Sequence, residues 1–406
     1  MIQLVEKDEN TTRTYVQQLK QRCDEKDRKV DAIVADILEN VRNNGDKAVA
    51  EYTLKFDGSI PEQVEITKEQ MKELTKQCDA YFLEALERAA KNIHEFHSRQ
   101  KQQSWLDTKD NGVILGQRVR GLAKVGIYVP GGTAAYPSSV LMNAIPAKIA
   151  GVQEIVMVTP PGKDGKPNPD IMAAALVAGV DRVFLVGGAQ AVAALAYGTE
   201  TMPKVDKIVG PGNIFVATAK KHLYGTVDID MIAGPSEILI VADETANPKY
   251  LAADLMSQAE HDVLASAILL TTSSKIAEET IAQIYEQVEC LERKDIINKS
   301  LDDFGAVIVC DTMDEAIEFA NDLAPEHLEV CVANPLEYIG RLDNAGSLFL
   351  GNYSPEPLGD YYAGPNHVLP TSGTARFFSP LSVDSFVKKS SFIYYTQDAL
   401  KAAKDD

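Results

Sequence analysis

The sequence lacks the features that mark secreted, membrane and nucleic-acid-binding proteins. It has five cysteines in 406 residues and none in CxxC spacing, which favours a reducing compartment over a disulfide framework or a thiolate metal site. No apolar run approaches the roughly 18 residues of a membrane span, and residues 1–10 contain no apolar core of a signal peptide. The net charge of -19 argues against a nucleic acid or an anionic membrane as partner. We therefore expect a cytoplasmic protein without either partner.

Two common fingerprints are also missing, namely the GxGxxG of dinucleotide-binding turns and the HExxH of zinc proteases. Instead, glycine-rich turns follow apolar segments, and such turns let backbone N–H groups approach phosphates. Taken alone, these turns are explained equally well by tight turns that need glycine dihedral angles. They are Pro130-Gly131-Gly132, Gly187-Gly188-Ala189-Gln190 and Gly210-Pro211-Gly212-Asn213.

Short apolar runs alternate with helical patterns through most of the chain, which is typical of parallel sheets with helices on both faces. A chain of 406 residues exceeds the usual limit of about 250 to 300 residues for one core, so two domains are expected. The fold class is predicted as α/β, with two doubly wound, Rossmann-like parallel sheets. The predicted strands are 125–129, 155–158, 183–186, 208–209, 238–241, 267–270, 307–309, 330–332 and 348–349.

Breaks in this rhythm near Lys124 and near Gly234-Pro235-Ser236 suggest that the middle of the chain is an inserted domain. The predicted division has residues 31–123 and 235–380 as one α/β domain and residues 124–234 as a second one inserted in it. Residues 1–30 and 381–406 are expected to be helical appendages.

The first candidate for acid and base chemistry is Glu326 followed by His327, in a chain with only six histidines. Thr312 and Glu315 form a capping box for a helix that Pro325 ends, and a strand follows from Leu328. The pair then lies on the connecting turn, where an imidazole can take a proton and a carboxylate can polarise water. An isolated Glu-His pair is more often simply solvated.

A second candidate is a metal site with ligands from two segments. Gln258 and His261 are three residues apart on one face of a predicted helix, and both side chains can bind zinc. Asp360 and His367 lie in the segment 352–380, a long connection without helical period, which is the kind of segment that usually has a function. The plain alternatives are a polar patch at a helix end and a structural loop.

The remaining histidines have simpler interpretations. His94 and His97 are expected at the surface or an interface, and His222 near a helix end is expected to complement the helix dipole.

Seven strings, in the same order and at similar spacing from about residue 30 to 390, resemble the histidinol dehydrogenase family. They are Gly126-Ile127-Tyr128-Val129-Pro130-Gly131-Gly132, Val186-Gly187-Gly188-Ala189-Gln190-Ala191, Gly210-Pro211-Gly212-Asn213, Ala233-Gly234-Pro235-Ser236-Glu237, Ser257-Gln258-Ala259-Glu260-His261, Pro325-Glu326-His327-Leu328 and Gly364-Pro365-Asn366-His367-Val368-Leu369-Pro370-Thr371.

The resemblance implies a cytoplasmic enzyme of histidine biosynthesis that oxidises L-histidinol, through L-histidinal, to L-histidine with two molecules of NAD. It also implies incomplete Rossmann-like domains, the inserted one binding NAD and the other holding zinc, in a homodimer. Carried over by motif, His327 is the base and Glu326 activates water. The ligands of Zn²⁺ are Gln258, His261 and Asp360, which with His327 also contact substrate. Ser236 and His367 contact substrate, and Tyr128, Gln190 and Asn213 contact NAD.

One departure from the family concerns its fourth zinc ligand, a histidine near the C-terminus donated across the dimer, because this chain has no histidine after His367. From this we expect that zinc is bound weakly or not at all and that activity is impaired. Two alternatives stay open: a catalytically silent homologue that binds NAD or substrate, and a dehydrogenase of a related amino or sulfonate alcohol. A metal hydrolase is disfavoured, because hydrolysis gives the glycine turns no role.

Overall fold

The computed structural model describes residues 2–6, 14, 17, 19, 27–131 and 136–406. Its contacts divide the chain into two compact units. Unit 1 comprises Met1–Ile37, Pro211–His222 and Met231–Pro380, and unit 2 comprises Leu38–Gly210, Leu223–Asp230 and Leu381–Asp406. None of the helices in the described part of the chain is long and apolar enough to cross a membrane.

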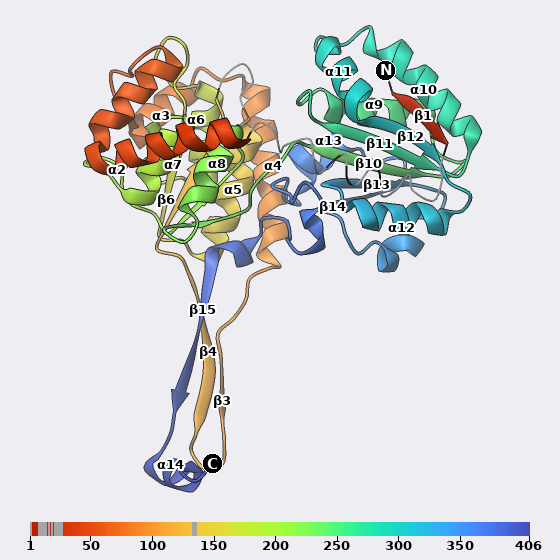
Figure 1. Cartoon of the computed structure of the whole chain (residues 1–406). Coiled ribbons are helices and arrows are strands. Elements are labelled where there is room, and N and C mark those ends of the chain that lie inside the picture. Colours follow the sequence, from red (N-terminus) through yellow and green to blue (C-terminus); the bar gives the residue numbers. More distant parts are fainter. Residues whose placement is uncertain (1, 7–13, 15–16, 18, 20–26, 132–135) are drawn as a thin grey trace. The chain divides into compact units, whose positions relative to one another are not determined.

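Unit 1 is built on a six-stranded, fully parallel sheet, in which helices cover both faces (Figure 1). The helices α9 (Pro248–Ala259), α10 (Ser274–Val288) and α11 (Lys294–Phe304) pack on one face, and α12 (Met313–Leu323) packs on the other. The strand order is β1 (Gln3–Glu6), β12 (Gly305–Val309), β11 (Ser266–Thr271), β10 (Glu237–Ala242), β13 (His327–Cys331) and β14 (Ser347–Leu350).

The sheet of unit 2 has six strands as well, and all pairs are parallel except the one that β2 makes with β7. Its order is β2 (Glu65–Ile66), β7 (Arg182–Leu185), β6 (Glu154–Thr159), β5 (Lys124–Tyr128), β8 (Lys207–Val209) and β9 (Asp228–Ile229). The parallel α/β fold class predicted from the sequence is thus confirmed for both sheets.

Local signals in the sequence explain the helix ends of unit 2. Helices α5 (Pro137–Ala150) and α6 (Pro169–Ala178) both end at glycines, Gly151 and Gly179, whose φ values of 81° and 74° are left-handed. A side chain at such a position is strained, so glycine ends the helix there. Helix α7 (Gly188–Tyr197) begins directly at a glycine turn.

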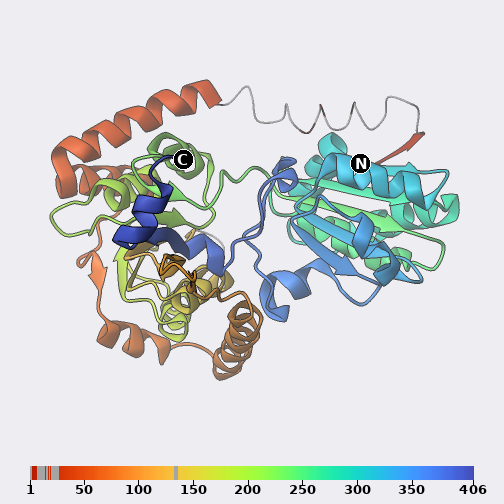
Figure 2. The ribbon, with the colours of Figure 1, turned by 90° about the horizontal axis from the view of Figure 1, so that it is seen from below.

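The segment before β5 packs with unit 2, which differs from the predicted grouping of residues 31–123 with 235–380. Helix α3 (Lys68–Thr75) packs on α6, and α4 (Ala80–Ser98) packs on α5. The cause is the apolar stripe of α4, which includes Leu86, Ala89 and Ile93. His97, which was expected at the surface or an interface, is completely buried. The preceding α2 (Asp27–Asp57) is the long orange-red helix of Figure 2.

The two chain ends also differ from the expected helical appendages. At the N-terminal end, Gln3–Glu6 is a strand that pairs in parallel with β12. At the C-terminal end, β15 (Val387–Tyr394) pairs antiparallel with β4 (Ile114–Gly121), which also pairs with β3 (Trp105–Thr108). Figure 1 shows these three strands as a long arm with α14 (Gln397–Ala403) at its tip. The pairing along all of β15 outweighs any local preference for helix.

Candidate functional site

The polar residues of unit 1 gather where strands β10 and β13 begin. His327 is the first residue of β13, and Glu237 is the first of β10, next to it in the sheet. Alternate residues of a strand point to opposite faces. Leu328 and Val330 therefore enter the core beneath α12, while His327 and Glu329 lie on the other face of the sheet, which α9 covers.

Hydrogen bonds fix the orientation of the His327 ring. Its Nδ1 lies 3.1 Å from the carbonyl oxygen of Glu237, which can only accept, so Nδ1 carries the hydrogen. Its Nε2 lies 3.1 Å from Oδ1 of Asp360 and 3.8 Å from Oε1 of Glu356. Both partners only accept, so each ring nitrogen carries a hydrogen and the imidazole is protonated, in line with its raised pKa; Nε2, which faces the carboxylates, can serve as a base once it has lost that proton.

Glu326 is fixed at the same place from two sides. Its Oε2 accepts hydrogen bonds from the backbone N–H of Glu237, at 3.0 Å, and from Nε2 of Gln258, at 3.4 Å. The same oxygen lies 3.7 Å from Nδ1 of His327. The predicted pair is therefore assembled in the fold, although it is buried rather than presented on an open turn.

The charges of this cluster are strongly perturbed. Burial raises the pKa of Glu326 to about 8. Burial alone would lower the pKa of His327, but the nearby carboxylates of Glu326 and Asp360 outweigh it and raise that pKa to about 10. Burial would raise the pKa of Asp360, but the His327 imidazole lowers it to about 2. The cluster is rich in buried carboxyl groups, and a bound cation would favour their ionised forms.

The predicted zinc ligands have the donor chemistry that a divalent cation needs. Oε1 of Gln258 is buried without a hydrogen-bond partner, although its amide nitrogen is bonded. Burial lowers the pKa of His261, which favours the neutral imidazole that binds metals, and Asp360 is ionised. A second group shares Asp360: atoms of His327, Glu356 and Asp360 lie within 4.8 Å of one another.

Four acidic residues that sequence reasoning missed lie in the same group of buried polar residues around His327. They are Glu237 and Glu356, described above, and Asp254 and Glu329. Burial raises the pKa of Glu356 to about 8. Asp254 and Glu329 form a second carboxyl pair, in which burial raises the pKa of Asp254 to about 6 and that of Glu329 well above its usual range. Spacing could have revealed this pair, because Asp254 lies one helical turn before Gln258 and Glu329 lies two residues after His327.

The two remaining predicted substrate residues flank this layer. Ser236 directly precedes β10, and its carbonyl accepts the N–H of Ser266. His367 Nδ1 donates to the backbone carbonyl of Asp360 at 2.9 Å, and burial lowers the pKa of His367.

The predicted NAD residues Tyr128 and Gln190 lie in unit 2, near the C-terminal ends of strands β5 and β7. The Tyr128 hydroxyl accepts the N–H of Gly188 at 3.0 Å, and burial raises the pKa of Tyr128 to about 12. Gln190 is fully buried, and neither polar atom of its amide has a partner. Gly210 leaves no room for a side chain, because an added Cβ would lie 2.2 Å from the carbonyl oxygen of Tyr128.

The third predicted NAD residue, Asn213, lies in the segment 211–222 of unit 1. Its Oδ1 accepts N–H groups of Phe215 and Val216, which caps α8 (Ile214–Leu223). The glycine turn after β5 includes Gly132, which is outside the described residues.

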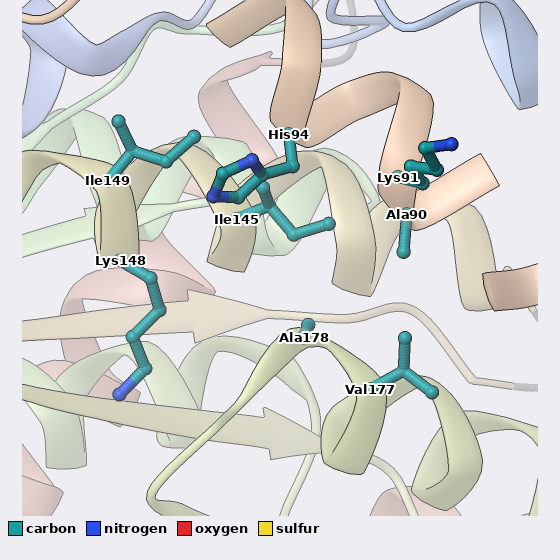
Figure 3. A pocket seen from close by; sticks show the side chains of 8 residues that line it. All are labelled: Ala90, Lys91, His94, Ile145, Lys148, Ile149, Val177 and Ala178. Carbon is teal, nitrogen blue, oxygen red and sulfur yellow. The ribbon is translucent and has the colours of Figure 1, made fainter. Parts of the chain in front are cut away.

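A pocket of about 370 Å³ in unit 2 is a different place (Figure 3). It lies among α4, α5 and α6, with apolar side chains such as Ile145, Ile149 and Val177 around His94. Lys148 also lines the pocket, and its ammonium group donates a hydrogen bond to Oδ2 of Asp181 at 2.7 Å. This surface holds none of the predicted site residues.

Comparison with known proteins gives one family. The family model described as histidinol dehydrogenase matches residues 20–406. A histidinol dehydrogenase of Clostridium acetobutylicum is 61% identical over 96% of this chain and 91% of its own length. One of Listeria innocua is 58% identical over 91% of this chain and 86% of its own length.

A solved structure agrees with this result. The crystal structure of histidinol dehydrogenase from Elizabethkingia anophelis is 39% identical, covers 100% of this chain and 93% of its own, and superimposes with a TM-score of 0.93. The chain belongs to the histidinol dehydrogenase family.

Proposed function

We propose that this protein oxidises L-histidinol, through L-histidinal, to L-histidine, as a step of histidine biosynthesis. Membership of the family gives the reaction. The observation that supports the mechanism is the fixed orientation of the His327 ring, whose Nε2 faces the carboxylates of Asp360 and Glu356. A bound cation that compensates the charge of Asp360 would let Nε2 lose its proton and act as a base. NAD, when bound, supplies the acceptor of hydride, and zinc supplies a Lewis acid that orients the substrate.

His327 is the base in both oxidations. In the first, Nε2 takes the proton of the substrate hydroxyl as the carbinol carbon loses hydride, and the alcohol becomes an aldehyde. Addition of water gives the hydrate. In the second, Nε2 takes a hydroxyl proton of the hydrate as the same carbon loses its second hydride, and the carboxylic acid forms. Each round leaves one proton on the imidazole, which must pass to solvent.

Glu326 acts on the water that adds to the aldehyde. Its carboxylate is held by the N–H of Glu237 and by the amide of Gln258, so it is oriented before water arrives. In its ionised form Glu326 can remove a proton from that water, and this form requires compensation of the charge around it.

Zinc is proposed to bind through Gln258, His261 and Asp360. The unpartnered Oε1 of Gln258 supports this choice, as does the neutral state of His261. The alternative group of His327, Glu356 and Asp360 would engage the base itself. Since a ligated Nε2 cannot accept a proton, we favour the first set, with Asp360 common to both.

The remaining contacts are proposed by motif. Substrate is contacted by Ser236, His327 and His367 and by the zinc ligands, and NAD is contacted by Tyr128, Gln190 and Asn213. The unpaired, fully buried amide of Gln190 supports a ligand at that edge, because an amide without partners is costly to bury.

A homodimer in the cytoplasm completes the proposal. The arm of unit 2 exposes large apolar side chains, with Leu106 at 66% and Ile393 at 73% of full exposure, which a second copy could cover. Cys78, Cys290, Cys310 and Cys331 are free thiols, as expected in a reducing compartment.

The test is the yield of NADH when L-histidinol is limiting and zinc is added. Two NADH per L-histidinol, with L-histidine as product, supports the proposal. Binding of NAD without NADH formation would identify a silent homologue. Faster oxidation of an alcohol without an imidazole would contradict the proposed substrate.

A further inference from the structure

Glu329 is a buried carboxyl group to which the proposed reaction assigns no role. It is 1% exposed and lies in the middle of β13, paired in the sheet with Ile240 of β10 and Phe349 of β14. A carboxyl group in such a place is costly to bury unless its hydrogen bonds are made. An apolar residue would fill the position without that cost.

The bonds of Glu329 lead to the segment that carries Asp360. Its Oε1 accepts the backbone N–H of Glu356 at 3.0 Å, and its Oε2 is buried without a hydrogen-bond partner. Burial and the nearby carboxyl group of Asp254 on α9 raise the pKa of Glu329. Glu356 begins the short helix α13 (Glu356–Leu358), which continues directly into η2 (Gly359–Ala363) with Asp360.

The same turn is fastened to α9 by a second bond. Ser257 Oγ donates to Oε2 of Glu356 at 3.0 Å, and carboxylate oxygens of Glu356 and Asp360 lie within 4.8 Å of each other. Asp360 in turn meets Nε2 of His327 at 3.1 Å. His327 and Glu329, which bonds the turn that carries Asp360, thus lie two residues apart on strand β13.

We propose that Glu329, with Asp254 beside it, is a positioning residue. Its hydrogen bond to the backbone N–H of Glu356 fixes the turn 356–360 to strand β13 and so holds Asp360 next to His327. Short helical turns such as α13 have few internal hydrogen bonds, so an external bond has a large share in fixing them. Partners that orient a ligand from behind typically change metal affinity or activity 10- to 100-fold when they are removed. The kinetic part of this proposal rests on the proposed function.

Two variants separate positioning from mere burial. Glu329→Gln keeps an oxygen that accepts the N–H of Glu356 and gains an N–H₂ that can donate to Asp254. Glu329→Leu keeps similar volume and removes the acceptor. Ser300→Ala serves as the control, because Ser300 is buried in the same unit and its lost bond, Oγ to the carbonyl of Ala265, belongs to α11 and not to this turn.

Three measurements apply to each variant: hydrogen exchange of the peptide spanning 352–363, zinc retained against a competing chelator, and kcat and KM for L-histidinol. We expect Glu329→Leu to speed exchange in that peptide, to lose zinc affinity about 10- to 100-fold and to lower kcat more than it raises KM. Glu329→Gln should stay within about threefold of the wild type in zinc affinity and kcat, since the tie is retained.

The proposal is overturned if Glu329→Leu keeps wild-type exchange and zinc affinity, or if Ser300→Ala reproduces its effects. It is also overturned if Glu329→Gln loses as much as Glu329→Leu. Exchange and zinc affinity do not depend on the substrate. A wild type that binds zinc but leaves L-histidinol unchanged would therefore contradict the proposed function alone.

Discussion

The two sheets share a strand order but carry their proposed functional groups at opposite ends of the strands. In unit 1 the parallel order is β12-β11-β10-β13-β14, and in unit 2 it is β7-β6-β5-β8-β9, which is the same path of the chain through the sheet. In unit 1 Glu237, Glu326 and His327 lie where β10 and β13 begin. In unit 2 the glycines Gly131, Gly187, Gly188 and Gly210 follow the ends of β5, β7 and β8.

The difference follows from what each edge is proposed to do. Proton transfer needs titratable groups whose pKa values are tuned by burial, and unit 1 has them at one edge. A phosphate needs backbone N–H groups that can be approached closely. Gly188 and Gly210 lie where an added Cβ would meet Gln190 and Tyr128, and their own N–H groups bond the Tyr128 hydroxyl and Asp230. Under the proposed assignment, the same topology supports two kinds of site, and the residues at the strand ends distinguish them.

The largest effect is expected from removing the base of unit 1. His327→Gln lacks an acceptor that can hold a proton, so kcat for L-histidinol should fall about 10²- to 10⁴-fold. Steady-state NADH formation measures this. A variant with more than a tenth of the wild-type kcat would contradict the role of His327.

Glu326→Gln should separate the two oxidations. The glutamine can still accept the N–H of Glu237, so the site remains assembled, but it cannot remove a proton from water. We expect the second NADH to form about a hundredfold more slowly, while the first forms at nearly the wild-type rate. Single-turnover kinetics would show this, and equal slowing of both steps would argue against the assignment.

The glycine edge of unit 2 is tested by Gly210→Ala. Gly210 has φ of 109°, and its new Cβ would meet the carbonyl of Tyr128, so we expect the free energy of unfolding to fall by roughly 2–5 kcal/mol. Gly225→Ala is the control, because Gly225 also has a left-handed φ, of 97°, but nothing within 4 Å of the added atom. Its cost should be roughly 1–2 kcal/mol. Equal losses in urea unfolding would contradict the steric argument.

The smallest effect concerns the pH dependence of stability. Because the folded state raises the pKa of Asp254 from 3.8 to about 6, its contribution is complete below pH 4 and is lost as the pH rises to 6. Asp254→Asn cannot ionise, so its urea midpoint should decline less over this window. The neighbouring Glu329 can also titrate. Measuring the same pH dependence for Glu329→Gln would separate its contribution from that of Asp254.

Sequence reasoning found the parallel α/β fold and the pair of Glu326 and His327, because strand periodicity and rare residue types are local signals. It did not find the strand character of residues 387–394, which depends on pairing with β4, over 260 residues earlier in the chain. The acids Glu237, Glu329 and Glu356 were also missed. Their importance comes from burial beside His327, and burial of a charged residue type is set by tertiary contacts that a single sequence does not display.

The central claim is that unit 1 carries the proton-transfer chemistry and unit 2 binds NAD. Its most direct test is calorimetric titration of NAD into the wild type, His327→Gln and Gln190→Leu. Leucine at position 190 removes the unpartnered amide from the glycine edge of unit 2. We predict that His327→Gln binds NAD as the wild type does, although it has lost turnover, and that Gln190→Leu binds NAD at least tenfold more weakly, a loss of about 1.4 kcal/mol. If His327→Gln loses NAD affinity while Gln190→Leu keeps it, the assignment of chemistry to unit 1 and of NAD to the glycine edge of unit 2 is contradicted.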